Sequence, residues 1–284
     1  MKNWFIGIAL LIPSLLKADI IETNNIEDIY PHVEEGTLVL LGMTDTITDS
    51  SLSIGSKPWR QYIRRHLGKD LLKQPDNLHD KWTFSVVRAV PVKPVQNEIV
   101  EWIDQLQKKE IPVFCINGRG RNVWYETVVD KVDQLTDDQL TNIGIHFEKS
   151  VVPEELKKAD PYLFHHGIFY TDPYSKGQFI EKILQETGYQ PKKVVIVDDK
   201  WEQLKAVEEK LIEAGIPHVC VLYQRAEKER KDFNPLIATI QLETLLEKNE
   251  VLTDEQAAEK AAALENPSAD ALFKKLVEKY GNLD

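Results

Sequence analysis

Five short apolar runs, rich in β-branched residues, constrain the fold of this chain more than any other feature. They are TLVLL at 37–41, PVFCI at 112–116, GIFYT at 167–171, VVIV at 194–197 and HVCVLY at 218–223. Their hydrophobicity is continuous rather than alternating, which is typical of strands that are buried on both faces of a parallel sheet. The runs therefore predict a mostly parallel central sheet that is covered on both sides.

Segments with helical periodicity lie between these runs. PVQNEIVEWIDQLQKK precedes the second run, SKGQFIEKILQETG follows the third, and KWEQLKAVEEKLIEAG follows the fourth. The last two end at Gly188 and Gly215, which suit the left-handed residue that often follows a helix. Strands that alternate with helices predict a three-layer α/β fold, with a ligand site at the carboxyl ends of the central strands.

Three further segments define the expected domain organisation. Residues from about 47 to 94 include GSKPWRQYIRRHL, which predicts a basic helix in a small helical cap, and a second insertion covers about 120–166. Residues 226–284 are charged and Ala-rich, and we expect a helical C-terminal tail with weak apolar faces. The core domain is then assigned to residues 19–225, with the cap as an insertion.

Residues 1–18 have the pattern of a secretory signal peptide. Lys2 is followed by an apolar run from Trp4 to Leu16, and the small residue Ala18 suits cleavage. The run is shorter than the ~20 residues of a membrane-spanning helix. We therefore expect an exported protein, periplasmic or secreted, with no transmembrane helix after cleavage. An uncleaved N-terminal anchor and a buried helix are the alternatives.

The composition excludes some classes of function. A formal net charge of -11, without a dense Lys/Arg run, argues against nucleic-acid binding and weakens a membrane-surface role, because both need a basic surface. Cys115 and Cys220, which each lie within an apolar run, are the two cysteines of the sequence. They are expected to be buried free thiols rather than part of a disulfide framework.

Polar residues follow the predicted central strands at the points where the strands end. They are Gly42, Met43, Thr44, Asp45 and Thr46 after the first, Asn117 after the second, Lys176 at a helix start after the third, and Asp198 with Asp199 after the fourth. Because the carboxyl ends of parallel strands meet at one edge of a sheet, these residues are expected to share one site.

In the order and strand context of these motifs, residues from about 35 to 225 resemble the haloacid dehalogenase superfamily of phosphatase-type folds. VVIVDDKWEQL and YSKGQF are the most specific stretches. Within that superfamily the chain looks closest to an uncharacterised group of exported proteins of intracellular bacteria. The resemblance implies a Rossmann-like three-layer fold with a cap, phosphoester substrates and a Mg²⁺ cofactor.

The resemblance also implies roles for the residues at the fourth and third strand ends. Asp198 and Asp199 match the acidic pair that holds Mg²⁺, and Lys176 matches the lysine that binds phosphate. Asn117 stands at the Ser/Thr position that binds phosphoryl oxygens, where its amide can donate a hydrogen bond.

The first motif departs from the family pattern. Gly42 stands where the resemblance places the aspartate nucleophile, and Thr44 stands where it places the acid/base. Glycine has no side chain that could attack phosphorus, and threonine is not an acid or base near neutral pH. The resemblance therefore implies a degenerate site, in which Mg²⁺ binding is weakened because one carboxylate is missing.

Three functions follow from these patterns. The chain could be a binding or interaction protein for a phosphorylated small molecule or a protein partner, with hydrolysis absent or very weak. It could instead be a Mg²⁺-dependent phosphomonoesterase that uses displaced acids such as Asp45. A receiver-type signalling domain is excluded, because its acidic pair follows the first strand. Loss of a covalent nucleophile costs orders of magnitude in rate, which favours the first function.

Two further groups of polar residues have weaker patterns. His165 and His166 could indicate a metal site, but no carboxylate stands at ligand spacing, so a surface loop is predicted. A basic and aromatic patch lies in the cap segment, and two arginines follow Asn117; both groups are expected to face either an anionic ligand or solvent. The patch is Trp59, Arg60, Tyr62, Arg64, Arg65 and His66, and the two arginines are Arg119 and Arg121.

Overall fold

The computed structural model describes residues 20–72, 77–124, 127–128, 131–230 and 232–281 of the chain. The signal peptide expected at residues 1–18 lies outside these ranges and stays a prediction.

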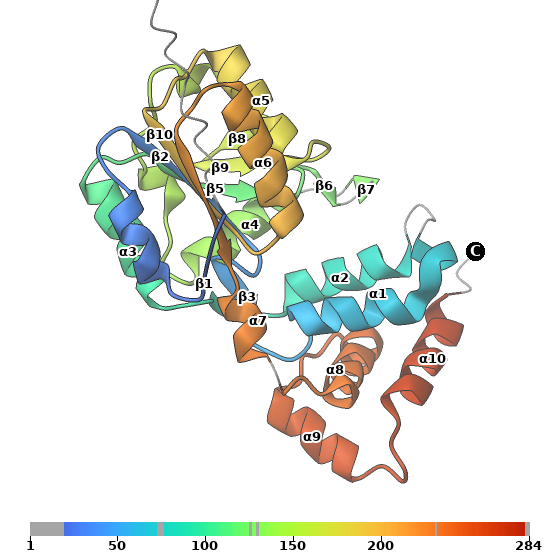
Figure 1. The fold of residues 1–284 in the computed structure, drawn as a ribbon. Coiled ribbons are helices and arrows are strands. Elements are labelled where there is room, and N and C mark those ends of the chain that lie inside the picture. The colour runs from blue at the N-terminus through green and yellow to red at the C-terminus, as the bar shows by residue number, and fades with distance from the viewer. Residues whose placement is uncertain (1–19, 73–76, 125–126, 129–130, 231, 282–284) are drawn as a thin grey trace, which may run out of the picture.

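A seven-stranded sheet forms the centre of the fold (Figure 1). Its strands, in spatial order, are β1 (Ile21–Thr23), β11 (His218–Tyr223), β10 (Lys193–Asp198), β2 (Thr37–Gly42), β5 (Val113–Asn117), β9 (Ile168–Tyr170) and β8 (Phe164–His165). Every neighbouring pair is parallel except β8 and β9, which are antiparallel. The five predicted runs are five of these strands, which confirms the mostly parallel sheet.

Helices cover both faces of the sheet. One face carries α3 (Glu98–Lys108), α4 (Val132–Thr141) and the 3-10 helix η1 (Ile26–His32), and the other carries α5 (Lys176–Thr187) and α6 (Trp201–Glu213). Within β2, Val39 and Leu41 pack into the first of these cores, whereas Leu38 and Leu40 pack into the second. The continuous apolar run is thus buried on both sides, and the three-layer, Rossmann-like α/β architecture is confirmed.

The cap segment leaves the sheet through a short two-stranded ribbon. β3 (Thr48–Ser50) and β4 (Val92–Pro94) pair antiparallel, so the segment departs from and returns to nearly the same place. Between them lie α1 (Lys57–Leu72) and α2 (Leu78–Ala89). The basic helix predicted here is α1, while the ribbon was not predicted.

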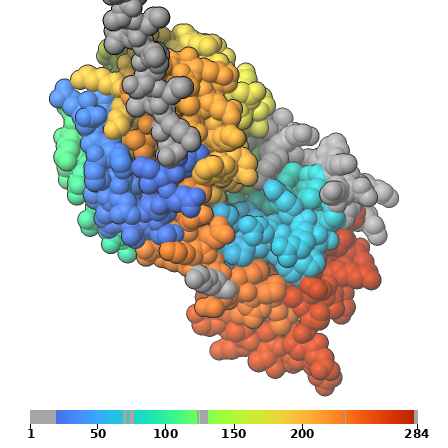
Figure 2. Space-filling model, in the orientation of Figure 1, coloured from blue at the N-terminus to red at the C-terminus, as the bar shows by residue number. Residues whose placement is uncertain are grey.

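The C-terminal helices pack against the cap. Helices α8 (Pro235–Lys248) and α10 (Ala269–Tyr280) share a hydrophobic core with α1 and α2, and α9 (Asp254–Ala262) packs against α8. Trp59, Trp82, Leu242 and Phe273 are at most 3% exposed in this core. These five helices are called the helical unit below; Figure 2 shows its cyan and red parts in contact. Two segments that the sequence suggests separately therefore form one body.

The remaining elements are short. They are β6 (Val123–Trp124), β7 (Thr127–Val128), α7 (Arg225–Glu229), and the 3-10 helices η2 (Phe147–Lys149) and η3 (Leu156–Lys158). Cys115 and Cys220 are both buried and free, and burial raises the pKa of each thiol to about 12. Within the described part of the chain, no helix combines the length and apolarity needed to cross a membrane.

Candidate functional site

A cavity of about 430 Å³ lies between the carboxyl ends of the central strands and the helices of the cap. Seven residues stand at positions with an expected catalytic, phosphate-binding or metal-binding role, and six of them line the cavity: Thr44, Asp45, Asn117, Lys176, Asp198 and Asp199. Helix α1 contributes side chains from one face, at positions 57, 60, 61 and 64, and α2 contributes others. The cap therefore forms one side of the cavity, which lies at the edge of the sheet where ligands bind in α/β folds.

Gly42 is the seventh residue, and it lies buried at the end of β2 rather than in the cavity lining. A Cβ atom at this position would be 2.8 Å from Asp198 Oδ2 and 2.9 Å from Thr46 Oγ1. Ordinary van der Waals contacts of a Cβ begin near 3.4 Å. The space that a side chain at position 42 would need is thus already filled by these two oxygens.

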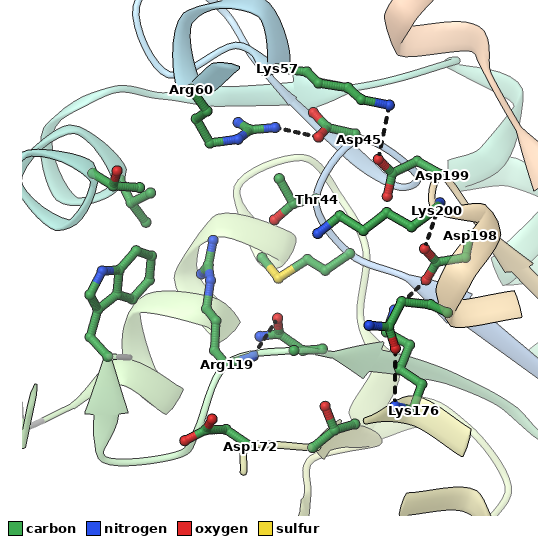
Figure 3. A pocket seen from close by; sticks show the side chains of 18 of the residues that line it. Thr44, Asp45, Lys57, Arg60, Arg119, Asp172, Lys176, Asp198, Asp199 and Lys200 are labelled. Carbon is green, nitrogen blue, oxygen red and sulfur yellow. Dashed lines mark hydrogen bonds and ion pairs between the residues drawn. The ribbon is translucent and has the colours of Figure 1, made fainter. Parts of the chain in front are cut away.

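Asp45 is placed by a tight turn that follows β2. Its backbone is left-handed, with φ 63°, and its amide donates to the Thr48 carbonyl at 2.7 Å. The Asp45 carboxylate forms an ion pair with Arg60, which reaches from α1 (Figure 3). The second carboxylate oxygen, Oδ1, has no hydrogen-bond partner among the described residues. The turn thus brings Asp45 to the cavity, but a cation already binds its carboxylate.

Lys176 and Asp198 contact each other directly. The Lys176 ammonium group pairs with Asp198 Oδ2, and both side chains are at most 10% exposed. Asp198 Oδ1 accepts a hydrogen bond of 3.0 Å from the backbone amide of Lys200. The two residues that the sequence assigns to phosphate and to metal therefore neutralise each other in this structure.

Asp199 pairs with Lys57 of α1, with the Lys57 Nζ and Asp199 Oδ2 atoms 3.3 Å apart (Figure 3). The contact is an ion pair without hydrogen-bond geometry, so Oδ2 has no hydrogen-bond donor among the described residues. Burial, followed by the neighbouring charges of Asp198 and Asp45, raises the pKa of Asp199 to about 6. Burial alone would lower the pKa of Lys57, but Asp199 and Glu227 outweigh it and the pKa is raised.

The three carboxylates do not form a metal site in this arrangement. Asp45, Asp198 and Asp199 each contact a different cationic side chain. Within the described ranges, the group of three metal-ligating side chains whose ligand atoms lie within 4.8 Å of one another does not include any of these carboxylates. Mg²⁺ needs oxygen ligands that converge, so these residues do not fit the ion as they stand. Magnesium binding stays a prediction.

Asn117 and Arg119 form the opposite wall. Asn117 Oδ1 accepts from the Arg119 amide at 3.2 Å, whereas the Asn117 amide nitrogen Nδ2 is buried and has no partner within the described ranges. The Arg119 guanidinium donates to Thr136 and Gln139 of α4 and lies 5.1 Å from the Trp124 ring centroid. This wall presents a fixed cation and an unsatisfied donor.

The basic and aromatic patch divides along α1. Trp59 and Tyr62 are buried in the helical unit, while Arg60 and Arg64 line the cavity. Arg65 lies on the exposed surface.

The cavity-lining residues of α1 follow an i, i+3, i+4, i+7 spacing, which is one helical face. This pattern could have revealed Lys57, which was not predicted. His66 contacts Asp270 of α10, and Arg121 pairs with Asp133 of α4, so neither belongs to the described cavity lining. Trp124, Asp172 and Gln203 were not predicted either, because nothing in the local sequence distinguishes them.

Comparisons with known proteins support a family of unknown function. The family model described as "Protein of unknown function (DUF2608)" matches residues 22–258. A protein of Chlamydia trachomatis serovar D named "Putative outer membrane protein" is 22% identical over 268 residues, which cover 91% of this chain and 97% of that protein. An uncharacterized protein of Rickettsia prowazekii is 21% identical over 263 residues, covering 89% and 92%. No solved structure matches the chain.

The resemblance to the haloacid dehalogenase superfamily is therefore wrong as an assignment. The family model that matches is the one of unknown function. In the structure, position 42 has no room for the side chain of a nucleophile, and Lys176 pairs with Asp198. By the extent of the match, the chain belongs to the DUF2608 family of proteins of unknown function.

Proposed function

We propose that this protein is an exported binding protein that holds a small anionic molecule, such as a phosphorylated metabolite, in the cavity beneath α1 and does not hydrolyse it. The observation that carries the proposal is the reversal of charge at the cavity. The chain as a whole has a formal net charge of -11, whereas the described lining holds six Lys or Arg side chains and four Asp side chains.

Pairing within the cavity keeps this positive surplus. Three of the four carboxylates already have a cation each: Asp45 with Arg60, Asp198 with Lys176, and Asp199 with Lys57. Arg64, Arg119 and Lys200 are the other three cationic side chains of the described lining, and Asp172 is its fourth carboxylate, so the lining has two more cationic than anionic side chains. Charges that line a cleft with low-dielectric walls attract ligands of the opposite sign, so an anion is favoured.

The buried amide of Asn117 supports an oxygen-rich ligand. Leaving a buried donor without an acceptor costs about 1–3 kcal/mol, and a phosphoryl or carboxylate oxygen placed there would remove that cost. A cavity of about 430 Å³ suits a small molecule rather than a macromolecule. Trp124 and Tyr174 add aromatic surface to the lining, which suits the uncharged part of such a ligand.

The same geometry argues against hydrolysis. Gly42 has no side chain and no space for one, and the Asp45 carboxylate is paired with a guanidinium that lowers its tendency to attack. A phosphomonoesterase that uses Asp45 is the second candidate, because Asp45 Oδ1 is unpartnered at the cavity. Binding without turnover agrees better with the three internal ion pairs.

Binding is tested by calorimetry on residues 19–284 with inorganic phosphate, phenyl phosphate and glucose 6-phosphate, at low and high salt. Arg64→Ala should weaken binding about 5-fold, from the loss of roughly 1 kcal/mol in a partly exposed charged contact. Arg65→Ala is the matched control, because Arg65 is adjacent but outside the described lining. Asn117→Asp should abolish binding by placing a negative charge where a donor stands. Equal affinity for glucose and glucose 6-phosphate would refute the proposal.

Hydrolysis is tested with an aryl phosphate in the presence and absence of Mg²⁺. We expect no release of phosphate above the buffer rate. Turnover that is lost in Asp45→Asn would establish the second candidate instead.

Export is supported by the pattern of the first 18 residues and by the Chlamydia relatives, whose names begin "Putative outer membrane protein". We propose a periplasmic or secreted location. N-terminal sequencing of the protein from a secreting host should begin at Asp19. A chain that retains Met1 in the cytoplasm would contradict this location.

A further inference from the structure

The turn between β8 and β9 brings together three side chains that the cavity does not use. His165 ends β8 and is half-buried, and His166 is exposed in the turn that follows. Asp137 lies on α4, and its Oδ2 atom is 2.8 Å from His166 Nδ1. The two imidazole rings are stacked, with their centroids 3.8 Å apart and their planes at 21° to each other. One ligand atom from each residue lies within 4.8 Å of the other two.

This cluster is separate from the cavity described above. The cavity lies at the carboxyl ends of the parallel strands, whereas the turn precedes β9 and so lies at its opposite end. None of the three residues belongs to the described lining of that cavity. A role for the cluster is therefore independent of the proposed function.

The backbone fixes the histidine pair in place. His166 and Gly167 are both left-handed, with φ 50° and 73°, which is the conformation of a tight hairpin. A Cβ atom at Gly167 would be 2.3 Å from the Phe147 carbonyl oxygen, and the Gly167 carbonyl accepts from the Cys115 amide at 3.1 Å. A left-handed histidine costs about 1 kcal/mol or more, so packing must hold the turn.

Asp137 is held from the other side by α4. The neighbouring Asp133 and Gln139 of this helix bind Arg121 at 2.8 Å and Arg119 at 3.0 Å. The carboxylate and the two imidazoles thus come from two anchored elements, α4 and the hairpin. Because the backbone of both elements is already ordered, binding of a ligand to the three groups costs little further backbone entropy.

Two imidazoles and one carboxylate are the donor set of a borderline transition metal. Zn²⁺ binds nitrogen and oxygen at about 2.0–2.2 Å with tetrahedral geometry, and three protein ligands leave the fourth position for water. Mg²⁺ and Ca²⁺ prefer oxygen ligands, so they are disfavoured here. For a tetrahedral ion, the His166 and Asp137 ligand atoms would separate to about 3.3 Å, roughly half an ångström more than their present hydrogen bond. One of the two stacked rings would also have to rotate about its side-chain bonds, because a metal ion lies in the plane of the imidazole that binds it.

We propose that Asp137, His165 and His166 form a binding site for a divalent transition-metal ion of the Zn²⁺ type. The ion replaces the proton that His166 and Asp137 share, and it joins α4 to the β8–β9 hairpin. The nearby guanidinium of Arg121 pairs with the carboxylate of Asp133, and the opposite charges of these two side chains offset each other. The charge at the site is then set mainly by Asp137 and the bound ion.

The test uses residues 19–284 with every affinity tag removed, because a polyhistidine tag would bind the same ions. Zn²⁺ is titrated at pH 7.5 in competition with a chromophoric chelator, and we expect one ion per chain with micromolar affinity or better. Co²⁺ added to the wild-type protein should give the visible absorption of a four-coordinate site. This second measurement needs no variant, so it remains decisive even if a substitution unfolds the chain.

Three substitutions locate the site. His165→Ala, Asp137→Asn and His166→Asn should each weaken Zn²⁺ binding at least 10-fold; asparagine is chosen at 166 because it tolerates a left-handed backbone. His146→Ala is the matched control, because His146 also contacts a surface carboxylate, Glu148, at 3.1 Å. This variant should bind Zn²⁺ as tightly as the wild-type protein. Wild-type protein that binds no Zn²⁺ at 100-fold excess over the chain, or variants that bind as tightly as the wild type, would overturn the proposal.

Discussion

The glycine at the end of β2 gives the most direct test of how the site is packed. In Gly42→Ala, the new Cβ atom would lie 2.8 Å from Asp198 Oδ2 and 2.9 Å from Thr46 Oγ1. Relative to an ordinary contact near 3.4 Å, each oxygen would have to move by about half an ångström. Whether the oxygens can move decides the energetic cost.

Asp198 has little freedom to move. Lys176 pairs with one carboxylate oxygen, and the Lys200 amide donates to the other at 3.0 Å. A third atom, the Val197 carbonyl oxygen, lies 3.3 Å from the position of the new Cβ atom and belongs to the backbone of the central strand β10. The neighbourhood of Gly42 therefore cannot relax by rotating one flexible side chain.

Overpacking of this kind costs about 1–3 kcal/mol. Partial separation of the buried Lys176–Asp198 pair adds to it, because complete loss of one partner costs about 3–5 kcal/mol. We expect Gly42→Ala to lower the free energy of unfolding by about 2–4 kcal/mol. An aspartate at position 42 would need still more space, so it should not restore a phosphatase site.

Urea unfolding followed by tryptophan fluorescence measures the effect. Gly118→Ala is the matched control, because Gly118 lines the same cavity and its added Cβ atom would have no neighbour within 4 Å. The control should change the free energy of unfolding by less than about 1 kcal/mol. If Gly42→Ala is as stable as Gly118→Ala, the packing argument is refuted.

Other changes test the charges and the helical unit. Because the folded pKa of Asp199 is raised from 3.8 to about 6, its contribution to stability is complete below pH 3.8 and is lost as the pH rises through 6. Urea titrations at several pH values should show that Asp199→Asn removes this decrease in the free energy of unfolding with pH, which is at most about 3 kcal/mol. Lys176→Met should lower the free energy of unfolding by about 3–5 kcal/mol, because it leaves the Asp198 carboxylate buried without a cation, whereas Lys182→Met on the surface should have little effect. Phe273→Ala should cost about 3–5 kcal/mol, measured in the same way, since its ring packs edge-on against Trp82 at 5.6 Å.

The sheet could be predicted from the sequence because its signal is local. Each central strand is a run of four to six residues that is apolar on both faces, and Gly188 adopts the expected left-handed conformation after α5, with φ 71°. The edge strands β1 and β8 were missed because three and two residues are too few to show periodicity.

The site could be predicted only as a set of positions. The cavity does collect residues from four strand ends, as parallel strands require. The partners of those residues are not local: Lys176 meets Asp198, and Asp45 meets Arg60 from the cap. Asp137 and His166 are 29 residues apart, so no spacing rule joined them. Residue identity thus suggested a degenerate phosphate and metal site, whereas only the three-dimensional structure shows which charged side chains pair with each other.

The helical unit has a consequence for the order in which this protein matures. Its core joins α1 and α2 to α8 and α10, which are synthesised more than 140 residues later in the order of the chain. Until α8 and α10 have been synthesised, Trp59 and Trp82 lack the apolar side chains that these two helices supply to the core. A chain stopped before Pro235 would expose that surface beside the cavity. The cap can therefore bury its apolar face only after α10 has been synthesised, and chaperones that hold apolar segments are expected to protect the chain until then.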